Sequence, residues 1–285
     1  MVDIHTVYFN LNSLKYNMEL INFMPDGLTE EIQKFLRSAF IMAKNAGDIH
    51  MKYFRIPNLE LSTKLNETDV VTIADKEAEK FILTYIKEHF PTHGIISEES
   101  GNYKEKSEWR WVIDPLDGTT NFSMGLPIFC VSIALEKNGE SYIGVVYVPY
   151  LGECFYGVKG KGAWFNGKPI LCSDKGRLSE AVVATGMPYD RKDNPDNNMA
   201  EINRMSLCVR GIRRMGSAAI DLCYTAAGFL DAYWELNLQR WDVAAGILIA
   251  KEAGVIIESI RKERNHSIMA TTPSLFLSFK RVLLE

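Results

Sequence analysis

Trp111-Val-Ile-Asp-Pro-Leu-Asp-Gly-Thr-Thr-Asn-Phe122 is the stretch around which the rest of this 285-residue chain is organised. Its first three residues are apolar and predict a short buried strand, and the proline and glycine that follow predict a break into a turn. Two carboxylates, Asp114 and Asp117, flank the restricted backbone of Pro115, so both can point at one centre where the strand ends. The stretch therefore predicts a site that holds a cation.

Backbone N–H groups follow the second carboxylate. Gly118-Thr119-Thr120 begins without a side chain and lies at the expected start of a helical turn, which suits a phosphate. A structural explanation competes, because Asp-Gly is a common turn and a threonine after it often only caps a helix. The spacing of the two carboxylates alone is weak evidence of function, whereas a string of this length is strong evidence.

Asp114 to Phe122 resembles the signature of the inositol monophosphatase family, within the Mg-dependent, lithium-sensitive phosphatases. Trp241-Asp242-Val-Ala-Ala-Gly246 resembles the second signature of that family. An aspartate at a helix start is ordinarily a cap, but two signatures in the right order identify the chain as a member. The resemblance covers residues 28–257. Residues 259–266 are short and basic, so the end of the chain is expected to be trimmed or irregular.

Composition agrees with an enzyme that acts on a small molecule. With 47% apolar residues the chain can bury one large core or two smaller packed ones, and we expect two apposed domains. The formal net charge of −4 gives no broad attraction to nucleic acid or to an anionic membrane. The five cysteines are odd in number and include no Cys-x-x-Cys pair, which favours reduced thiols in a cytoplasm.

The resemblance implies a layered αβαβα sandwich of the sugar-phosphatase type, combining α+β and α/β parts. We expect an antiparallel-sheet domain that binds metal over residues 28–172 and a smaller α/β domain on the substrate side over residues 173–285. Residues 1–27 contain no unbroken apolar run, so they are neither a signal peptide nor a membrane span. They are predicted to be a flexible extension, or the start codon is assigned too early and Met18 or Met24 is the true beginning.

Periodicity and turn residues predict the elements that carry the site. The expected elements are a helix from the Thr29 cap toward Tyr53, a polar hairpin-like region at 59–71, a helix at 73–90, strands at 94–97, 128–136, 142–148 and 153–158, a strand at 182–185, a helix near 199–209, a small-residue helix from about Gly216, a strand at 232–235 and a helix opened by Asp242. The charged loop at 190–198 is predicted to be the most mobile element.

Carboxylates at the ends of two neighbouring strands, Glu98 and Asp114, are expected to face one crevice. The resemblance implies that a first metal ion takes Glu98, Asp114, the Leu116 carbonyl and the Thr119 hydroxyl, that a second takes Asp114, Asp117 and Asp242, and that a third, weaker ion lies near Glu98. Oxygen ligands without histidine or cysteine favour Mg²⁺, with Mn²⁺ as a possible substitute.

The resemblance also implies the chemistry, which is in-line hydrolysis of a phosphate monoester without a covalent intermediate. Thr119, oriented by Asp69, would position the attacking water, and Lys64 matches a further catalytic position near it. The N–H groups of Gly118 and Thr119 would hold phosphate oxygens.

The implied substrate is a polyol monophosphate such as myo-inositol 1-phosphate. Asp117 and Glu235 would bind ring hydroxyls, the backbone of Ala218 would contact the sugar, and Asp242 would lie beside it. Close helix packing explains the small residues around Ala218 equally well. Thr120 favours this branch over the adenosine 3′,5′-bisphosphate phosphatases, which typically have lysine there. A homodimer is implied by the resemblance.

Two alternatives stay open. Arg240 departs from the family pattern and could reach a second phosphate, as in fructose 1,6-bisphosphate, although we favour a side chain that points into solvent, because arginine is mostly exposed. A basic patch could instead serve a regulatory protein of the RNA machinery. Its members would be Arg210, Arg213, Arg214 and residues 261–264. The intact set of metal ligands argues against a nucleic-acid partner as the main one.

Overall fold

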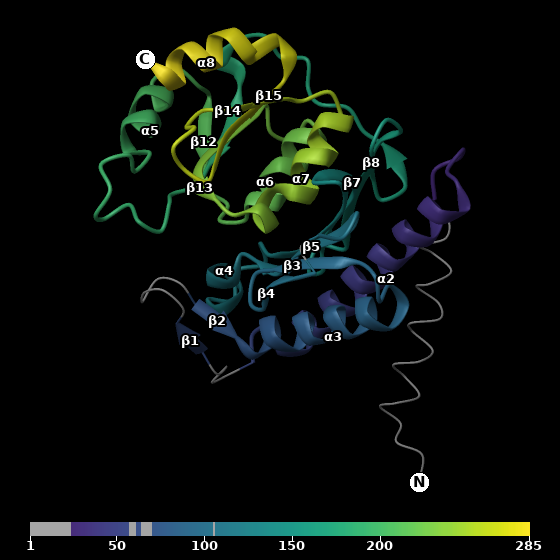
Figure 1. The fold of residues 1–285 in the computed structure, drawn as a ribbon. Coiled ribbons are helices and arrows are strands. Elements are labelled where there is room, and N and C mark those ends of the chain that lie inside the picture. The colour runs from purple at the N-terminus through teal and green to yellow at the C-terminus, as the bar shows by residue number, and fades with distance from the viewer. Residues whose placement is uncertain (1–23, 57–60, 64–69, 105) are drawn as a thin grey trace.

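The structure is a computed structural model that describes residues 24–56, 61–63, 70–104 and 106–285. Five layers alternate between helices and sheets (Figure 1). In order they are α2 and α3, an eight-stranded sheet, α6 and α7, a five-stranded sheet, and α5 with α8. The predicted αβαβα sandwich is confirmed, and no helix of the described ranges is both long enough and apolar enough to cross a membrane.

The larger sheet has the strand order β10-β9-β8-β7-β6-β5-β3-β4. Its strands are β3 (Gly94–Ser97), β4 (Gly101–Tyr103), β5 (Trp109–Asp117), β6 (Cys130–Lys137), β7 (Glu140–Val148), β8 (Glu153–Val158), β9 (Gly162–Phe165) and β10 (Lys168–Pro169). All neighbours are antiparallel except β3 and β5, so the expected antiparallel sheet is in fact mixed. The parallel pair matters for the site, because both strands end at the same edge.

Helices α2 (Glu30–Tyr53) and α3 (Ile73–His89) cover the outer face of this sheet. Thr29 caps α2 as expected, and Thr72 and Asp75 form a capping box at the start of α3. A short antiparallel hairpin, β1 (Leu61–Thr63) and β2 (Val70–Thr72), precedes α3 and agrees with the hairpin-like region predicted there.

The middle layer consists of α6 (Ala218–Ala226) and α7 (Arg240–Glu252), which lie between the two sheets. Small residues bring these helices close to their neighbours. A Cβ atom at Gly246 would lie 2.8 Å from the side chain of Leu222, and one at Gly144 of β7 would lie 2.8 Å from the carbonyl oxygen of Ala245. One apolar core therefore joins α6 and α7 to both sheets.

The smaller sheet has the order β12-β11-β13-β15-β14. Its strands are β11 (Val182–Thr185), β12 (Gly211–Arg213), β13 (Ala232–Leu238), β14 (Ile256–Ser259) and β15 (His266–Thr271). Helices α5 (Met199–Ser206) and α8 (Phe276–Leu284) form the outer layer. The irregular end expected after residue 257 is wrong, because β14, β15 and α8 complete the sheet and its cover. The domain boundary at residue 172 stays a prediction.

Candidate active site

Strand β5 carries the signature to the edge of the larger sheet. It continues through Pro115 to Asp117, so the break predicted at the proline is wrong, and the pairing with β6 instead shifts register between Asp114 and Asp117. The chain turns at Gly118, which has φ +90° and starts the short helix α4 (Thr119–Ser123). A Cβ atom at Gly118 would lie 2.8 Å from the Ile128 carbonyl oxygen, so only glycine fits this turn.

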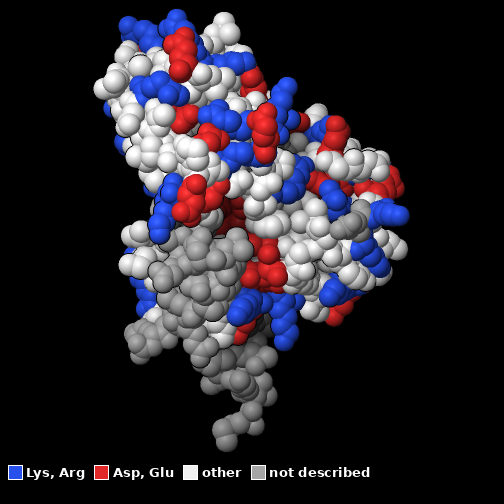
Figure 2. Space-filling view, turned by 60° about the vertical axis from the view of Figure 1, so that its left-hand side comes forward, with Lys and Arg blue, Asp and Glu red and all other residues white. Residues whose placement is uncertain are grey.

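The four carboxylates predicted from sequence come together at this edge. The backbone N–H of Glu98 donates to the carbonyl of Ile113 (3.3 Å), which places the end of β3 beside Asp114. Burial, followed by the charges of Glu98, Asp117 and Asp242, raises the pKa of Asp114 well above its usual value. Figure 2 shows a band of acidic side chains in the recess between the two halves of the molecule.

The pKa values of Asp117 and Asp242 are shifted in the same direction. Burial raises the pKa of Asp117 to about 6, and burial together with the charge of Asp117 raises the pKa of Asp242 well above its usual value. Within the described ranges, no lysine or arginine forms an ion pair with Asp114, Asp117 or Asp242. Acidic groups that are buried together without a cation are costly, so this edge suits a positive ion.

A magnesium ion fits the donors at this edge. The described His, Cys, Asp and Glu side chains do not converge as a finished cluster of ligands. The donor atoms at the edge are nonetheless all oxygens, which is the ligand type that Mg²⁺ prefers. The candidate ligands are Glu98, Asp114, the Leu116 carbonyl, Asp117, the Thr119 hydroxyl and Asp242.

The hydroxyl of Thr119 lies 2.9 Å from the carbonyl oxygen of Leu116 and donates to Oδ1 of Asp75 (3.0 Å). Asp75 is held in turn, because its Oδ2 accepts from both the backbone N–H (2.8 Å) and the hydroxyl (2.6 Å) of Thr72. Burial raises the pKa of Asp75 to about 7. A carboxyl that titrates near neutral pH beside a hydroxyl is suited to proton transfer.

The Thr119 hydroxyl contacts Asp75, a residue that the sequence reasoning missed, and the contact expected of Asp69 stays a prediction. Asp69 and Lys64 lie outside the described residues. A signal was present, since Thr72-Ile-Ala-Asp75 has the spacing of a capping box. That spacing fixes Asp75 at the start of α3, close to the strand ends.

The substrate side is built by α6 and β13. Oδ2 of Asp117 accepts from the Ser217 hydroxyl (2.6 Å) and from the N–H of Ala219 (2.9 Å), so Asp117 lies against the first turn of α6, which contains Ala218. Glu235 of β13 faces the same recess, and its Oε2 accepts from the hydroxyl of Tyr233 (2.7 Å). Burial raises the pKa of Glu235 to about 7.

A further acidic residue, Asp221 of α6, was not predicted. Both of its carboxyl oxygens are buried without a hydrogen-bond partner, and burial and the charge of Glu235 raise its pKa well above the usual value. The sequence offered one signal, which is a lone aspartate inside the apolar run Ala-Ala-Ile-Asp-Leu-Cys.

Arg240 does not point into solvent as we favoured, and it does not reach the recess. Its Nε donates to Oε1 of Glu136 (2.6 Å), and its Nη2 donates to the Ser141 hydroxyl (3.2 Å). The buried Glu136 also pairs with Arg110. A buried carboxylate needs cationic partners, and Arg240 is one of them. The guanidinium that the sequence left available for a second phosphate is therefore already paired with Glu136.

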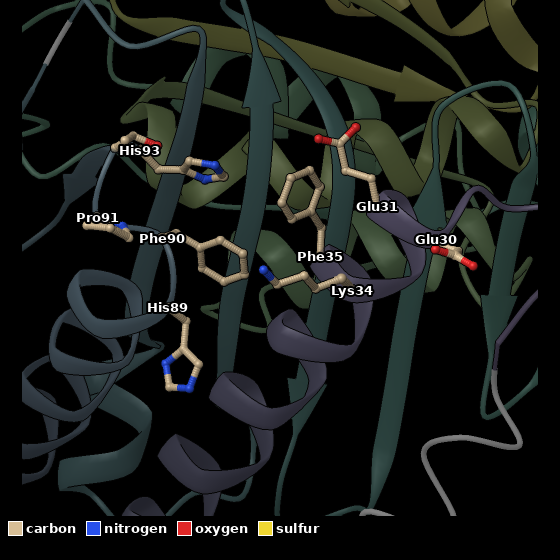
Figure 3. Close-up of a pocket in the computed structure, with 9 residues that line it drawn as sticks. Glu30, Glu31, Lys34, Phe35, His89, Phe90, Pro91 and His93 are labelled. Carbon is tan, nitrogen blue, oxygen red and sulfur yellow. The ribbon is translucent and has the colours of Figure 1, made fainter.

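The structure also contains a hollow of about 470 Å³ away from these carboxylates (Figure 3). It lies between the first turn of α2, with Lys34 and Phe35, and the end of α3, with Phe90 and His93. Asp75 is at the opposite end of α3, so this hollow is separate from the recess.

The chain is similar to known proteins over most of its length. The family model described as the inositol monophosphatase family matches residues 31–279. A protein of Pasteurella multocida (strain Pm70) named Nus factor SuhB is 43% identical, covering 78% of this chain and 84% of that protein. A protein of Aquifex aeolicus (strain VF5) named fructose-1,6-bisphosphatase/inositol-1-monophosphatase is 38% identical, covering 79% and 85%.

Among solved structures, that of the inositol monophosphatase from Anabaena (Nostoc) sp. PCC 7120 superposes with a TM-score of 0.79 at 39% identity. The match covers 89% of this chain and 96% of that one. The layers shared with that structure and the match of the family model over most of the sequence lead to one conclusion: this chain belongs to the inositol monophosphatase family.

Proposed function

We propose that this phosphatase hydrolyses the phosphate monoester of a polyol such as myo-inositol 1-phosphate, with Mg²⁺ as its cofactor. The observation that carries the proposal is the hydrogen bond from Thr119 to Asp75 beside the buried Asp114 and the half-buried Asp117. It combines a hydroxyl that can hold water, a carboxyl that can accept a proton and a group of acids that binds cations.

Mg²⁺ bound by the acidic groups would supply positive charge to a bound water and to the leaving oxygen. The chain itself would orient the reactants. The Thr119 hydroxyl can donate its one hydrogen to the Leu116 carbonyl (2.9 Å) or to Asp75 (3.0 Å), and when it donates to Asp75 its oxygen is left to accept from the attacking water. Asp75 can take up the proton that passes through this hydrogen bond. The N–H groups of Gly118 and Thr119, at the first turn of α4, would donate to phosphate oxygens.

Recognition of the alcohol part would fall to Asp117, Glu235 and the backbone at Ala218. Asp117 and Glu235 each retain one carboxyl oxygen to which no hydrogen bond is assigned, and these can accept from ring hydroxyls. We further infer a homodimer and a cytoplasmic location. The family resemblance supports the first, and five cysteines without a disulfide support the second.

A sugar bisphosphate is a second candidate substrate. Its support is the dual name of the Aquifex aeolicus relative and the exposed Arg214, whose charge reaches Glu235 and partly opposes the rise that burial causes in the pKa of that carboxyl. Arg240 contributes nothing to this candidate, because Glu136 holds it.

A regulatory role is a third candidate, supported by the name of the Pasteurella multocida relative. The basic patch expected for it is smaller than the sequence suggested. Arg261 and Arg264 form ion pairs with Asp190, Asp196 and Glu201, and the exposed cations that remain of the patch are Arg210, Arg213, Arg214 and Lys262.

The first experiment measures phosphate release from myo-inositol 1-phosphate, fructose 1,6-bisphosphate, histidinol phosphate and adenosine 3′,5′-bisphosphate, with Mg²⁺, with EDTA and with added Li⁺. We expect Mg-dependent, Li-inhibited turnover that is fastest on the inositol ester. A preference for a bisphosphate would replace the proposed substrate, and no turnover on any ester would favour the regulatory role.

The perturbed acids also predict how stability depends on pH. In the folded state the pKa values of Asp75 and Glu235 lie near 7 and that of Asp117 near 6, above their ordinary values. Their protonated forms stabilise the fold fully below about pH 4, and this contribution is lost as the pH rises toward 7. In EDTA, the melting temperature should therefore fall by about 5 °C or more between pH 5 and pH 8.

Saturating Mg²⁺ should raise the melting temperature much more at pH 8 than at pH 5, since the ion binds the deprotonated acids. Differential scanning fluorimetry at four pH values checks this. A melting temperature that rises with pH in EDTA, or a Mg²⁺ effect that is equal at both ends of the range, would contradict the prediction.

A further inference from the structure

Asn198 makes an unusual set of contacts for a loop residue. It is fully buried, has φ +73° and immediately precedes α5. Its Nδ2 donates to the carbonyl of Gly186 (2.6 Å) and to the hydroxyl of Thr185 (2.8 Å), and its Oδ1 accepts from Nε1 of Trp234 (2.6 Å). One side chain thus connects the end of β11 to β13.

The place where these contacts meet is the wall of the substrate recess. The hydroxyl of Thr185 also donates to the carbonyl of Trp234 (2.7 Å), which fixes the two strands at this level. A Cβ atom at Gly186 would lie only 1.9 Å from Oε1 of Glu235, so the backbone of Gly186 packs directly against that carboxylate. The position of Glu235 therefore depends on the position of the Gly186 peptide, which Asn198 holds.

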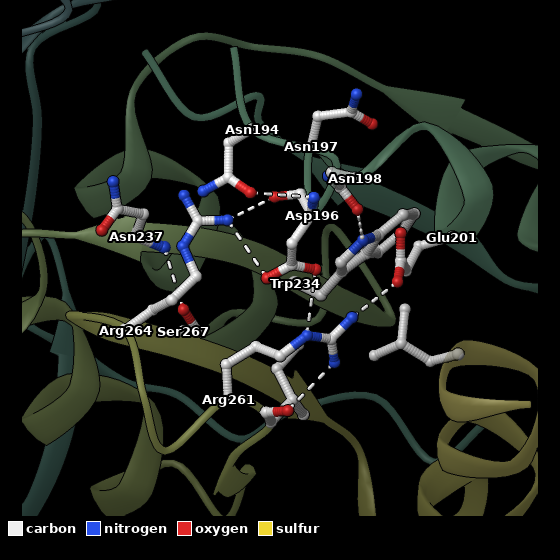
Figure 4. Close-up of polar contacts among 12 residues, drawn as sticks. Asn194, Asp196, Asn197, Asn198, Glu201, Trp234, Asn237, Arg261, Arg264 and Ser267 are labelled. Carbon is white, nitrogen blue, oxygen red and sulfur yellow. Dashed lines mark hydrogen bonds and ion pairs between the residues drawn. The ribbon is translucent and has the colours of Figure 1, made fainter. Parts of the chain in front are cut away.

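Ion pairs hold the loop before Asn198 from the outside (Figure 4). Arg264 pairs with Asp190 (2.7 Å) and Asp196 (3.1 Å), and Arg261 pairs with Asp196 (3.1 Å). Both arginines follow β14, so the short basic segment that departs from the family pattern is the part that ties down this loop. Asn198 is consequently fixed between the outer ion pairs and the inner strand ends.

We infer that Asn198 is a positioning residue that aims Glu235 at the hydroxyl groups of the substrate. It sets how strongly the enzyme prefers a phosphate on a polyol to a phosphate on a group without hydroxyls. The inference rests on the proposed function, because it requires that the alcohol part of the substrate meets Glu235. It assigns selectivity to a side chain that never touches the substrate.

The test compares myo-inositol 1-phosphate with p-nitrophenyl phosphate, an ester whose ring has no hydroxyl. The variant is Asn198→Gly, because glycine keeps the positive φ while removing all three side-chain hydrogen bonds. We expect kcat/KM for the inositol ester to fall about 10- to 100-fold, mainly through KM, as for other groups that orient a functional ligand. Turnover of the aromatic ester should stay within about threefold of the unchanged protein.

Three further variants separate positioning from general damage. Trp234→Phe removes the Nε1 donor together with part of a buried ring, and it should change selectivity in the same direction by less. Asn194→Ala is the matched control, because Asn194 lies in the same loop but bonds to Asp190 (2.9 Å) and not to the strand ends. Glu235→Gln combined with Asn198→Gly should lose little more selectivity than Glu235→Gln alone, since the two act in series.

Each outcome decides between explanations. The positioning role would be overturned if Asn198→Gly lowered kcat/KM equally for both esters. It would also be overturned if the loss of selectivity in the double variant equalled the sum of the losses in Asn198→Gly and Glu235→Gln. If the unchanged protein prefers the inositol ester and Asn198→Gly prefers it equally, the inference alone is wrong. If the unchanged protein cleaves only the aromatic ester, the proposed substrate is wrong, and the inference fails with it.

Discussion

Replacing Asp114 with Asn is expected to lower kcat for phosphate release by about 10³-fold or more, the scale seen when a group that stabilises transition-state charge is lost. Asp114 is the acid whose pKa is raised by all three of its neighbours, Glu98, Asp117 and Asp242. It therefore lies at the centre of the charge that attracts Mg²⁺. An amide of the same shape keeps the packing and removes the charge at that centre.

The fold of Asp114→Asn should survive. Because the charged form of Asp114 is disfavoured by burial and by its neighbours, the substitution should leave the metal-free protein at least as stable at pH 8. The melting temperature in EDTA and the stabilisation by Mg²⁺ are measured together with kcat. A matched control is Glu153→Gln on β8, a half-buried carboxyl that accepts from Tyr224. Near-normal turnover of Asp114→Asn would mean that the metal assignment is wrong.

The local sequence pattern predicted correctly the elements whose backbone is not altered by the strands and helices packed against them. The strands at 94–97 and 182–185 and the helix after Thr29 are present as expected, because alternation, helical spacing and a cap decide them. Strand β5 is longer than predicted, because the sequence predicted a break at Pro115. Pairing with β6 carries the backbone past Pro115, which lies within a register shift where the missing N–H is tolerated. β6 is the next strand along the chain, but the residues around Pro115 themselves carry no signal of this pairing.

The same distinction applies to the site. Glu98, Asp114, Asp117 and Asp242 were found because long signatures surround them or a buried strand leads to them. Arg240 was misjudged because its partner, Glu136, is 104 residues away. Average exposure is a poor guide for a side chain with a buried counterion. Asp221 was missed because its neighbour in space, Glu235, is brought near it only by the packing of α6 on β13.

The second large effect on kcat is expected from substitution of Asp75, with Asp69 as the comparison. Asp75→Asn should reduce kcat about 10²- to 10⁴-fold, the usual contribution of a positioned acid or base. The amide oxygen can still accept from the backbone N–H of Thr72, while the amide NH2 takes the place of Oδ1 and can only donate to the Thr119 hydroxyl. What it cannot do is take up a proton at neutral pH. KM should change much less than kcat, because neither Asp75 nor Thr72 is expected to bind the alcohol part of the substrate.

Asp69→Asn is the comparison that makes this result informative, because sequence reasoning placed that residue, and not Asp75, behind Thr119. If catalysis depends on the carboxylate that contacts the Thr119 hydroxyl, substitution of Asp75, which makes the 3.0 Å contact, should lower the rate. Asp69→Asn should then retain most of its activity. Thr72, the N-cap of α3, is unchanged in Asp75→Asn, and an amide oxygen can still accept from its backbone N–H, so α3 should begin normally and the melting temperature should show this. A large loss in Asp69→Asn with little loss in Asp75→Asn would instead restore the original assignment and leave the Thr119–Asp75 bond a purely structural cap.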